Sequence, residues 1–208
     1  MALTIYGVAL SRANRTLWLA EELGLAYRHI ETEFRPIVPD HCRTAEFLGI
    51  NPNGHVPVID DDGLIVWESM AINLYLARKH GGALAPATLS EEAQMTMWSF
   101  WATTEVELDA LTLLLDRAAP SKSKRRQTSV TKAIERLQAP VAVLDAHLGR
   151  CRYVVGDRFT VADINLATVF EWIGPAPSLL ARSRHVAGWL SNCLSRPACR
   201  TVQAMVRP

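Results

Sequence analysis

The pattern of apolar and polar positions changes once along the chain, near residue 80. Before that point, short apolar runs typical of strands stand between segments with helical spacing. After it the strand signals stop, and apolar residues recur every three or four positions, which is typical of helices. The pattern therefore predicts a small α/β domain at residues 1–80, a linker at residues 81–89 and an all-helical domain at residues 90–208.

The first part of the chain is predicted to hold four strands and two helices in the order β-α-β and then β-β-α, which is the thioredoxin-like arrangement. An Asp-Gly pair before Leu64 is a strong signal for a tight hairpin turn between the last two strands. Glycines mark the ends of both helices, at Gly24 and at Gly81. The predicted strands are Leu3 to Val8, Tyr27 to Glu31, His55 to Asp60 and Leu64 to Trp67, and the predicted helices are Ser11 to Leu23 and Ser69 to His80.

The rest of the chain is predicted to be helical. One apolar stripe contains Pro140, which predicts either a kink or a break in its helix. The segment Thr160 to Ile173 is apolar nearly all round, so we expect it to be the central buried helix. Thr160 and Asp163 have the spacing of a capping box, which explains Asp163 as a helix-start signal and not as a catalytic acid. The other predicted helices are Ser90 to Asp116, Ile134 to Leu148, Arg184 to Ser195 and one that begins near Pro197.

The composition argues against several classes of protein. The 208 residues carry a formal net charge of +1, so nothing favours electrostatic capture of nucleic acid. No apolar run reaches the roughly twenty residues that a membrane-spanning helix needs, and the first residues do not resemble a secretory signal. The four cysteines fit neither a redox pair nor a zinc site, and the six histidines form no metal-binding motif. We therefore predict a cytoplasmic protein with reduced thiols and no metal.

Two motifs carry the candidate chemistry. The first is N-P-x-G-x-V-P at residues 51–57, followed after the hairpin by E-S-x-A-I-x-x-Y-L at residues 68–76. The second is the segment at residues 153–163, which opens the central helix. Together these motifs resemble those of the soluble glutathione S-transferase family, in the right order and over most of the chain. The resemblance implies a thioredoxin-like domain that binds glutathione, an all-α domain that contributes the electrophile site, and a homodimer.

The same resemblance assigns glutathione binding to two short segments. In the family the peptide bond before Pro57 is cis, and the backbone of Val56 pairs with the cysteine portion of the tripeptide as an added strand would; a plain turn proline is the alternative. At the start of a helix, Ser69 would bind the γ-glutamyl carboxylate and Glu68 its ammonium group, whereas the alternative for Ser69 is a helix cap. The implied glutathione-binding residues are Asn14, His55, Val56, Pro57, Glu68 and Ser69.

The sulfur atom of glutathione needs a group that stabilises its thiolate. A thiol has a pKa of about 8.5, so most of it is protonated at neutral pH. Ser11 is predicted at the start of the first helix, where a hydroxyl donor and the helix dipole would both favour a thiolate. This serine resembles the catalytic serine of theta-like and bacterial family members. We predict Ser11 as the catalytic residue, with Tyr6 and Asn14 as alternatives, and a simple cap role for Ser11 also stays open.

The predicted function is that of a glutathione transferase, an enzyme of detoxification that conjugates the glutathione thiolate to hydrophobic electrophiles. Glutathione is the expected co-substrate. One alternative is a glutathione-binding regulatory or structural protein with the same fold, and another is a glutathione-dependent lyase or dehalogenase. The aromatic segment at residues 95–105 has three possible roles, as core, as a wall of the electrophile pocket or as a dimer interface, and all three stay open.

Overall fold

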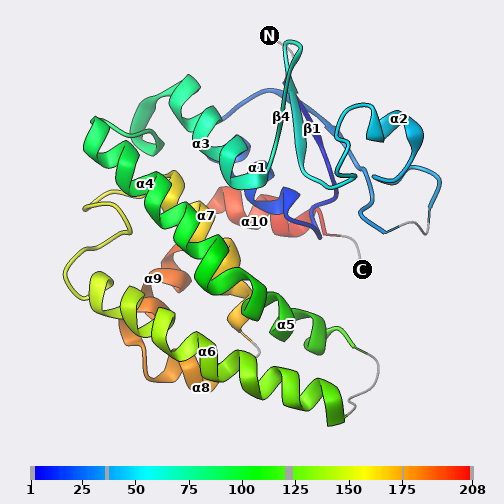
Figure 1. Ribbon diagram of the computed structural model, residues 1–208. Helices are drawn as coiled ribbons and strands as arrows, with labels where there is room; N and C mark the ends of the chain where they lie inside the picture. Colours follow the sequence, from blue (N-terminus) through cyan, green and yellow to red (C-terminus); the bar gives the residue numbers. More distant parts are fainter. Residues whose placement is uncertain (1–2, 36–37, 120–123, 175, 207–208) are drawn as a thin grey trace. The chain divides into compact units, whose positions relative to one another are not determined.

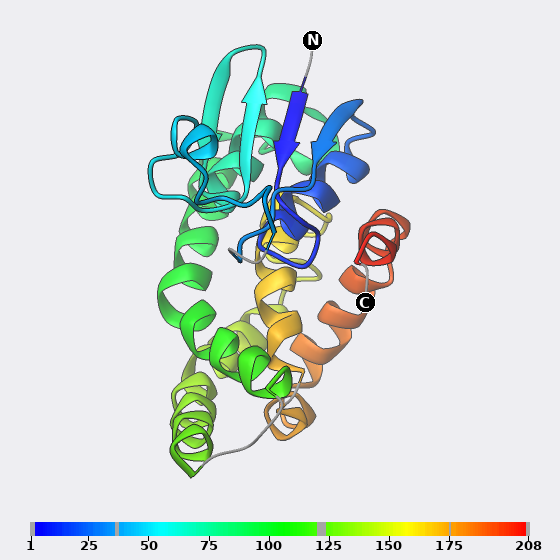
Figure 2. The ribbon, with the colours of Figure 1, turned by 90° about the vertical axis from the view of Figure 1, so that its right-hand side faces the viewer.

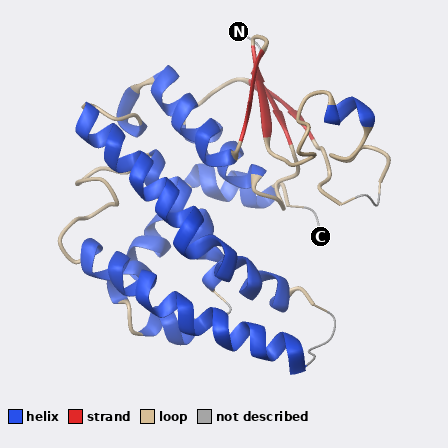
Figure 3. Cartoon of the chain, in the orientation of Figure 1, coloured by secondary structure: helices blue, strands red, loops and turns tan. Residues whose placement is uncertain are grey.

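The chain forms two compact units. The structure is a computed structural model that describes residues 3–35, 38–119, 124–174 and 176–206. The first unit consists of residues 1–85 together with residues 195–208, and the second of residues 86–194. Among the described residues, all strands belong to the first unit and the second is helical (Figure 3). The predicted fold class, a thioredoxin-like α/β domain followed by an all-α domain, is confirmed.

The first unit is built around a four-stranded sheet (Figure 1). Its strands are β1 (Leu3–Tyr6), β2 (Tyr27–Ile30), β3 (Val58–Asp61) and β4 (Leu64–Trp67), and its helices are α1 (Ala13–Glu22), α2 (Ala45–Leu48), α3 (Ser69–His80), the 3-10 turn η1 (Gly82–Leu84) and α10 (Pro197–Ala204). The predicted hairpin turn is confirmed, because Asp62 and Gly63 join β3 to β4 with φ values of 55° and 92°.

The strands lie in the order β2-β1-β3-β4. β1 is parallel to β2 and antiparallel to β3, and β4 is antiparallel to β3 (Figure 2). Tyr6 at the end of β1 is paired with Val58 at the start of β3, which is in turn paired with Trp67 at the end of β4. The end of β1, the start of β3 and the end of β4 therefore lie in one row at the same end of the sheet.

The two faces of the sheet have different partners. Tyr6 and Val58 pack in a hydrophobic cluster with Phe47 of α2. Their sequence neighbours Ile5 and Ile59 are fully buried, and alternation along a strand directs them to the opposite face. There α1 and α3 pack against the sheet and against each other. Both faces of the sheet thus pack against other elements around β1 and β3, whereas Leu64, Ile65 and Trp67 of β4 are exposed.

The C-terminal segment that begins at Ser195 follows the second unit in the sequence but belongs to the first unit. Its helix α10 packs against α1. Arg196 donates two hydrogen bonds to the carboxylate of Glu22, at 2.6 and 2.7 Å, and Trp18 donates a third at 3.0 Å. This partly buried ion pair fixes the C-terminal end of α1. The predicted functional split at the 81–89 linker stays a prediction.

The second unit is arranged around α7. All ten residues of this helix are buried, and it packs against α4, α5 and α9. The predicted central helix and its capping box at Thr160 and Asp163 are both confirmed. The elements of this unit are α4 (Leu89–Trp101), the π-helical turn η2 (Ala102–Val106), α5 (Glu107–Arg117), α6 (Lys124–Leu148), α7 (Val161–Phe170), the 3-10 turn η3 (Glu171–Ile173), α8 (Pro177–Ala181) and α9 (Arg184–Leu194).

The prediction of one regular helix from Ser90 to Asp116 is wrong in its middle, where the π-helical turn separates α4 from α5. The hydroxyl of Ser99 donates to the carbonyl of Met95 at 2.7 Å, and that of Thr103 to the carbonyl of Ser99 at 3.2 Å. Such back-bonding competes with the backbone hydrogen bonds and loosens a helix locally. Pro140, by contrast, lies inside a continuous α6, so this helix is not broken.

Some predicted element ends are shifted. β1 ends at Tyr6 and not at Val8, because Gly7 follows with a φ of 132°. β3 begins at Val58 and not at His55, because Pro57 has no N–H to donate to a strand partner. α1 begins at Ala13 and not at Ser11. All four cysteines are free, as expected, and none of the described helices is long and apolar enough to cross a membrane.

Candidate functional site

Three loops meet at one end of the sheet in the first unit. Residues 7–12 follow β1, residues 55–57 precede β3, and residues 68–69 follow β4. Because the corresponding strand ends lie in one row of the sheet, these loops are neighbours in space. Nearly all of the predicted site residues lie in them. The sheet topology therefore brings together segments that are far apart in the sequence.

Gly7 allows two of these loops to approach closely. A methyl group on Gly7 would lie 2.8 Å from the Cβ of Ala13 and 3.1 Å from the Cβ of Val56. Both distances are shorter than ordinary carbon contacts of about 3.5–4.0 Å. The φ of 132° is also a value that residues with side chains rarely adopt. Glycine at this position therefore sets the spacing between the start of α1 and the Val56 loop.

Ser11 lies in the turn just before α1. Its hydroxyl donates to the carbonyl of Val8 at 2.7 Å, and its oxygen accepts from the backbone N–H of Ala13 at 3.1 Å. The same Val8 carbonyl also accepts from the backbone N–H of Ser11 at 2.9 Å. The hydroxyl can therefore turn to another acceptor without leaving the Val8 carbonyl unpaired. The contact with Ala13 keeps the oxygen at the positive end of α1 while the proton is redirected.

The two alternatives to Ser11 are placed differently. Tyr6 is half-buried in the cluster around Phe47, with its ring edge-on to Phe47 at a centroid distance of 6.2 Å. That environment is typical of a core tyrosine. Asn14 is also half-buried, and its side-chain amide lies 3.5 Å from the carbonyl of Ala9, a long hydrogen bond. Because the amide has two N–H groups, one remains available for a ligand.

Val56 offers an unpaired stretch of backbone. Its side chain is buried, and the peptide bond to Pro57 is cis, as the resemblance implied. Among the described residues, none forms a hydrogen bond with the backbone N–H or C=O of Val56. A backbone donor and acceptor on one residue fit the peptide backbone of a ligand, in the manner of an added strand.

Buried Asn51 holds the loop before Val56 in shape. Its side chain donates to the carbonyl of His55 at 2.8 Å and accepts from the backbone of Asn53 at 3.0 Å. Gly54 has a φ of 59°, and a methyl group there would lie 2.9 Å from the carbonyl oxygen of Cys42. These contacts explain physically why the motif contains asparagine and glycine at these two positions.

Glu68 and Ser69 lie at the start of α3. Glu68 is exposed and is the N-cap residue, with a φ of 73°. A residue with a side chain rarely adopts this conformation, which is enriched at functional sites. The alternative role of Ser69 as the N-cap is wrong, because Glu68 is the N-cap and Ser69 is the first residue of the helix. The hydroxyl oxygen of Ser69 accepts a hydrogen bond from Arg15. The N–H groups in the first turn of a helix have no acceptor within the helix, and together with the helix dipole they favour an anion.

Sequence reasoning missed Arg43 as a candidate. A methyl group on Gly54 would lie 3.1 Å from an Nη atom of Arg43, so this guanidinium lies directly beside the loop that carries exposed His55. The backbone N–H of Arg43 donates to the ring of His41 at 3.0 Å. The basic residues at positions 41 and 43 are visible in the sequence, but only the fold shows that Arg43 adjoins the Val56 loop.

No described group of three His, Cys, Asp or Glu side chains is arranged to hold a metal ion. The chemistry of the three loops is instead that of a peptide-binding site: a strand-like backbone at Val56, a helix N-terminus at Ser69 and a hydroxyl donor at Ser11. These groups fit the backbone, the carboxylate and the sulfur of a short thiol-containing peptide.

Comparisons with known proteins agree with this chemistry. The family model for the glutathione S-transferase N-terminal domain matches residues 1–78, and the model for the C-terminal domain matches residues 103–197. Glutathione S-transferase 1 of Zea mays is 30% identical over 215 residues, which cover 98% of this chain and 97% of that protein. The chain belongs to the glutathione S-transferase family. The resemblance of its motifs to this family is therefore confirmed.

Other members of the glutathione S-transferase family are similar over nearly the whole chain. Glutathione S-transferase GstB of Escherichia coli is 30% identical over 195 residues, which cover 92% of each protein. The crystal structure of a theta class glutathione S-transferase from Xanthomonas axonopodis pv. citri with glutathione bound is 29% identical, with a TM-score of 0.83. The matched region spans 96% of this chain and 95% of the Xanthomonas chain. Both transferase domains are thus present here in family order.

Proposed function

We propose that Ser11 stabilises the thiolate of bound glutathione, and that this thiolate attacks hydrophobic electrophiles. As a glutathione S-transferase, the chain is an enzyme with glutathione as its co-substrate. The observation that best supports the role of Ser11 is its hydrogen bonding, because the Val8 carbonyl stays paired when the hydroxyl turns away. A theta-like use of serine is part of the proposal, and the similarity to a theta class structure is consistent with it.

The proposed reaction needs few groups from the protein. The thiol of glutathione loses its proton to solvent, and the hydroxyl of Ser11 donates to the resulting thiolate. The sulfur then forms a bond to the electrophilic carbon, and with an aryl halide the carbon–halogen bond breaks and halide leaves. A hydrogen bond to a charged acceptor is about twice as strong as a neutral one, so the hydroxyl favours the thiolate over the Val8 carbonyl.

The remaining site residues are proposed to hold the tripeptide. The backbone of Val56, next to Pro57, would pair with the cysteine portion, and Ser69 with the first turn of α3 would bind the γ-glutamyl carboxylate. Glu68 would accept from the γ-glutamyl ammonium. Exposed His55 would lie toward the glycine end, with Arg43 beside its loop supplying positive charge.

Replacing Ser69 by alanine is expected to raise the KM for glutathione about tenfold or more and to change kcat by less than about threefold. The reason is that Ser69 is proposed to bind the carboxylate, which takes no part in the reaction at sulfur. Steady-state kinetics with a generic aryl halide would measure both constants. Ser90→Ala, an exposed serine in the first turn of α4, is the matched control. An unchanged KM in Ser69→Ala would contradict the assignment.

A binding assay on immobilised glutathione, combined with analysis of the reaction products, tests the alternative functions. Retention on immobilised glutathione without turnover of any electrophile would favour a regulatory or structural protein. Elimination or dehalogenation without formation of a conjugate would favour a lyase or dehalogenase. The transferase proposal requires both binding and conjugate formation.

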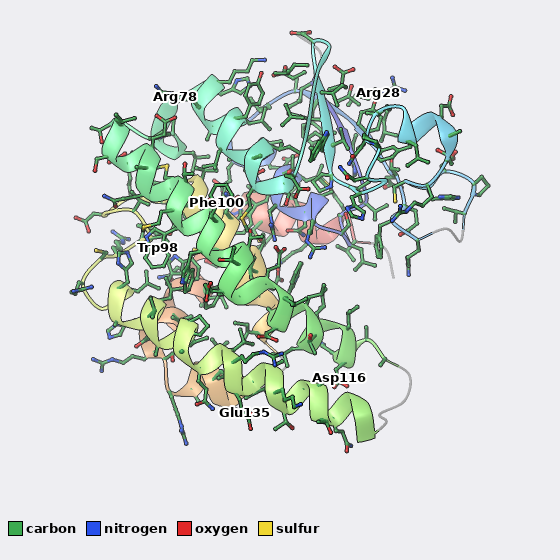
Figure 4. All side chains as sticks on the ribbon, viewed as in Figure 1. Arg28, Arg78, Trp98, Phe100, Asp116 and Glu135 are labelled. Carbon is green, nitrogen blue, oxygen red and sulfur yellow. The ribbon has the colours of Figure 1, made fainter. Side chains whose placement is uncertain are left out.

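We also propose that the chain forms a homodimer. In the second unit, α4 exposes Met97 and Phe100, which are 54% and 67% exposed and lie three residues apart on one helix face. Trp98, on the same helix, is by contrast 7% exposed. Figure 4 labels Trp98 and Phe100 on this helix. Leu108 of α5 is 73% exposed. Large apolar side chains gathered on a surface are typical of a protein–protein interface.

Replacing Phe100 by glutamate is expected to shift the protein from dimer to monomer, because a charge would be buried at the proposed interface. Sedimentation velocity of the wild type and the variant would measure this shift. Val143→Glu changes a comparably exposed residue on α6 and should leave the dimer intact. A wild-type protein that is monomeric at micromolar concentration would contradict the proposal.

The helical unit is proposed to supply contacts for the electrophile, as the resemblance implied. The residues of the aromatic segment at 95–105 have different roles. Met95 and Trp98 are buried and belong to the core, whereas Phe100 is exposed. A cytoplasmic location and a role in detoxification are part of the same proposal.

A further inference from the structure

Arg15 is a buried arginine on α1, with a relative exposure of 2%. Its Nη1 atom donates a hydrogen bond to the hydroxyl oxygen of Ser69 at 3.1 Å. Its backbone carbonyl accepts a hydrogen bond from the side-chain amide of Asn73, also at 3.1 Å. Ser69 and Asn73 lie one turn apart on α3, so a single residue of α1 holds the first turn of α3 at two points.

The contact between Arg15 and Ser69 fixes the direction of the serine hydroxyl. A guanidinium group has only donors, so the oxygen of Ser69 is the acceptor in this contact. The single proton of the hydroxyl must therefore point to a different atom. Among the described residues, the hydroxyl of Ser69 takes part only in the hydrogen bond that it accepts from Arg15. The hydroxyl is thus set to donate, and its guanidinium partner makes it a stronger donor to an anion.

We propose that Arg15 is a positioning residue for the γ-glutamyl carboxylate of glutathione and that it acts through Ser69. This inference rests on the proposed function, in which that carboxylate binds at the start of α3. Arg15 holds the oxygen of Ser69 from the buried side, and the hydroxyl donates to the carboxylate on the other side. Because the guanidinium is buried beneath Ser69, it orients the donor without itself touching glutathione.

The placement of Arg15 also connects the two ends of the ligand. Ser11 lies in the turn before α1, and Arg15 lies four residues later, in the first turn of that helix. The same helix end therefore carries the proposed donor to the sulfur and the support for the γ-glutamyl donor. A change at Arg15 should affect recognition of the carboxylate while leaving the hydrogen bonds of Ser11 intact.

The test compares two ligands that differ only in this carboxylate. One is S-hexylglutathione, and the other is its analogue in which a 4-aminobutyryl group replaces the γ-glutamyl residue. This replacement removes the α-carboxylate and keeps the amine at the same carbon. Titration calorimetry would measure the affinity of each ligand for the wild type, Arg15→Gln and Arg15→Lys. The exposed neighbour Arg12→Gln serves as the control for loss of a positive charge.

The wild type is expected to prefer the ligand with the carboxylate by about tenfold or more. Arg15→Gln should reduce this preference about fivefold or more while the affinity for the analogue changes by less than about twofold. Arg15→Lys, which keeps the charge but loses the planar fork, should reduce it less. Arg12→Gln should leave it unchanged. In the Ser69→Ala background, Arg15→Gln should have no further effect on the preference, which a merely structural role would not produce.

An unchanged preference in either folded Arg15 variant would overturn the proposal. If Arg15→Gln does not fold, Arg15→Lys decides alone, and its preference must fall below that of the wild type. A wild-type protein that binds neither ligand would instead contradict the proposed function. A wild type that prefers the carboxylate, together with Arg15 variants that keep this preference, would contradict only the role of Arg15.

Discussion

Replacing Ser11 by alanine is expected to lower the kcat of glutathione conjugation about 10- to 100-fold and to leave the KM for glutathione within about threefold of its original value. A hydrogen bond to a charged group contributes about 1.5–3 kcal/mol, and this bond forms only when the sulfur is ionised. Loss of the donor therefore affects the reactive thiolate more than the bound peptide. Stopped-flow or steady-state kinetics with an aryl halide would measure the effect.

Variants of the two alternative donors complete this experiment. Asn14→Ala should lower kcat less than Ser11→Ala, because the Asn14 amide already lies near the carbonyl of Ala9. Tyr6→Phe should have little effect on kcat, because Tyr6 packs against Phe47 in the core cluster. Full activity in Ser11→Ala, with a large loss in either of the other variants, would assign the thiolate donor to that residue instead.

Replacing Asp163 by alanine is expected to lower the free energy of unfolding by about 3–5 kcal/mol. The carboxylate of Asp163 is fully buried, and burial raises its pKa. Four donors stabilise it: the backbone N–H groups of Val154 and Thr160 at 2.9 and 2.8 Å, the indole of Trp189 at 2.8 Å and the hydroxyl of Thr160 at 3.1 Å. Alanine would leave all four buried donors without their acceptor.

Chemical denaturation followed by circular dichroism would measure this loss of stability. Asp157→Ala changes an exposed aspartate in the same segment and should cost less than about 0.5 kcal/mol. At a temperature where Asp163→Ala is still folded, its KM for glutathione should match that of the wild type. A stable variant with reduced kcat would show that Asp163 takes part in the chemistry, contrary to its assignment as a helix-start residue.

Much of the fold could be predicted because its signals are local. The Asp62-Gly63 turn, the capping box at Thr160 and the apolar central helix each depend on residues close together in the sequence. The π-helical turn after Trp101 could not be predicted, because it depends on which backbone carbonyls accept hydrogen bonds from the hydroxyls of Ser99 and Thr103. The return of residues 195–208 to the first unit likewise depends on contacts between distant segments.

In the candidate site, too, only the features with local sequence signals could be predicted. The motifs placed Val56 beside a strand start and Glu68 and Ser69 at a helix start, where the structure also has them, because turns and helix starts have local sequence signatures. They did not show that the hydroxyl of Ser69 is held by Arg15, a residue 54 positions earlier in the chain. Only the packing of α1 against α3 establishes that contact.

The most direct test of the role of Ser11 is the titration of the glutathione thiol while it is bound to the enzyme. The ultraviolet absorbance of the thiolate, recorded against pH, gives the pKa of the bound thiol in the wild type and in Ser11→Ala. We expect a pKa clearly below the ordinary value of about 8.5 in the wild type and a return toward that value in the variant. An unshifted pKa in the wild type, or the same lowered pKa in both proteins, would contradict the account.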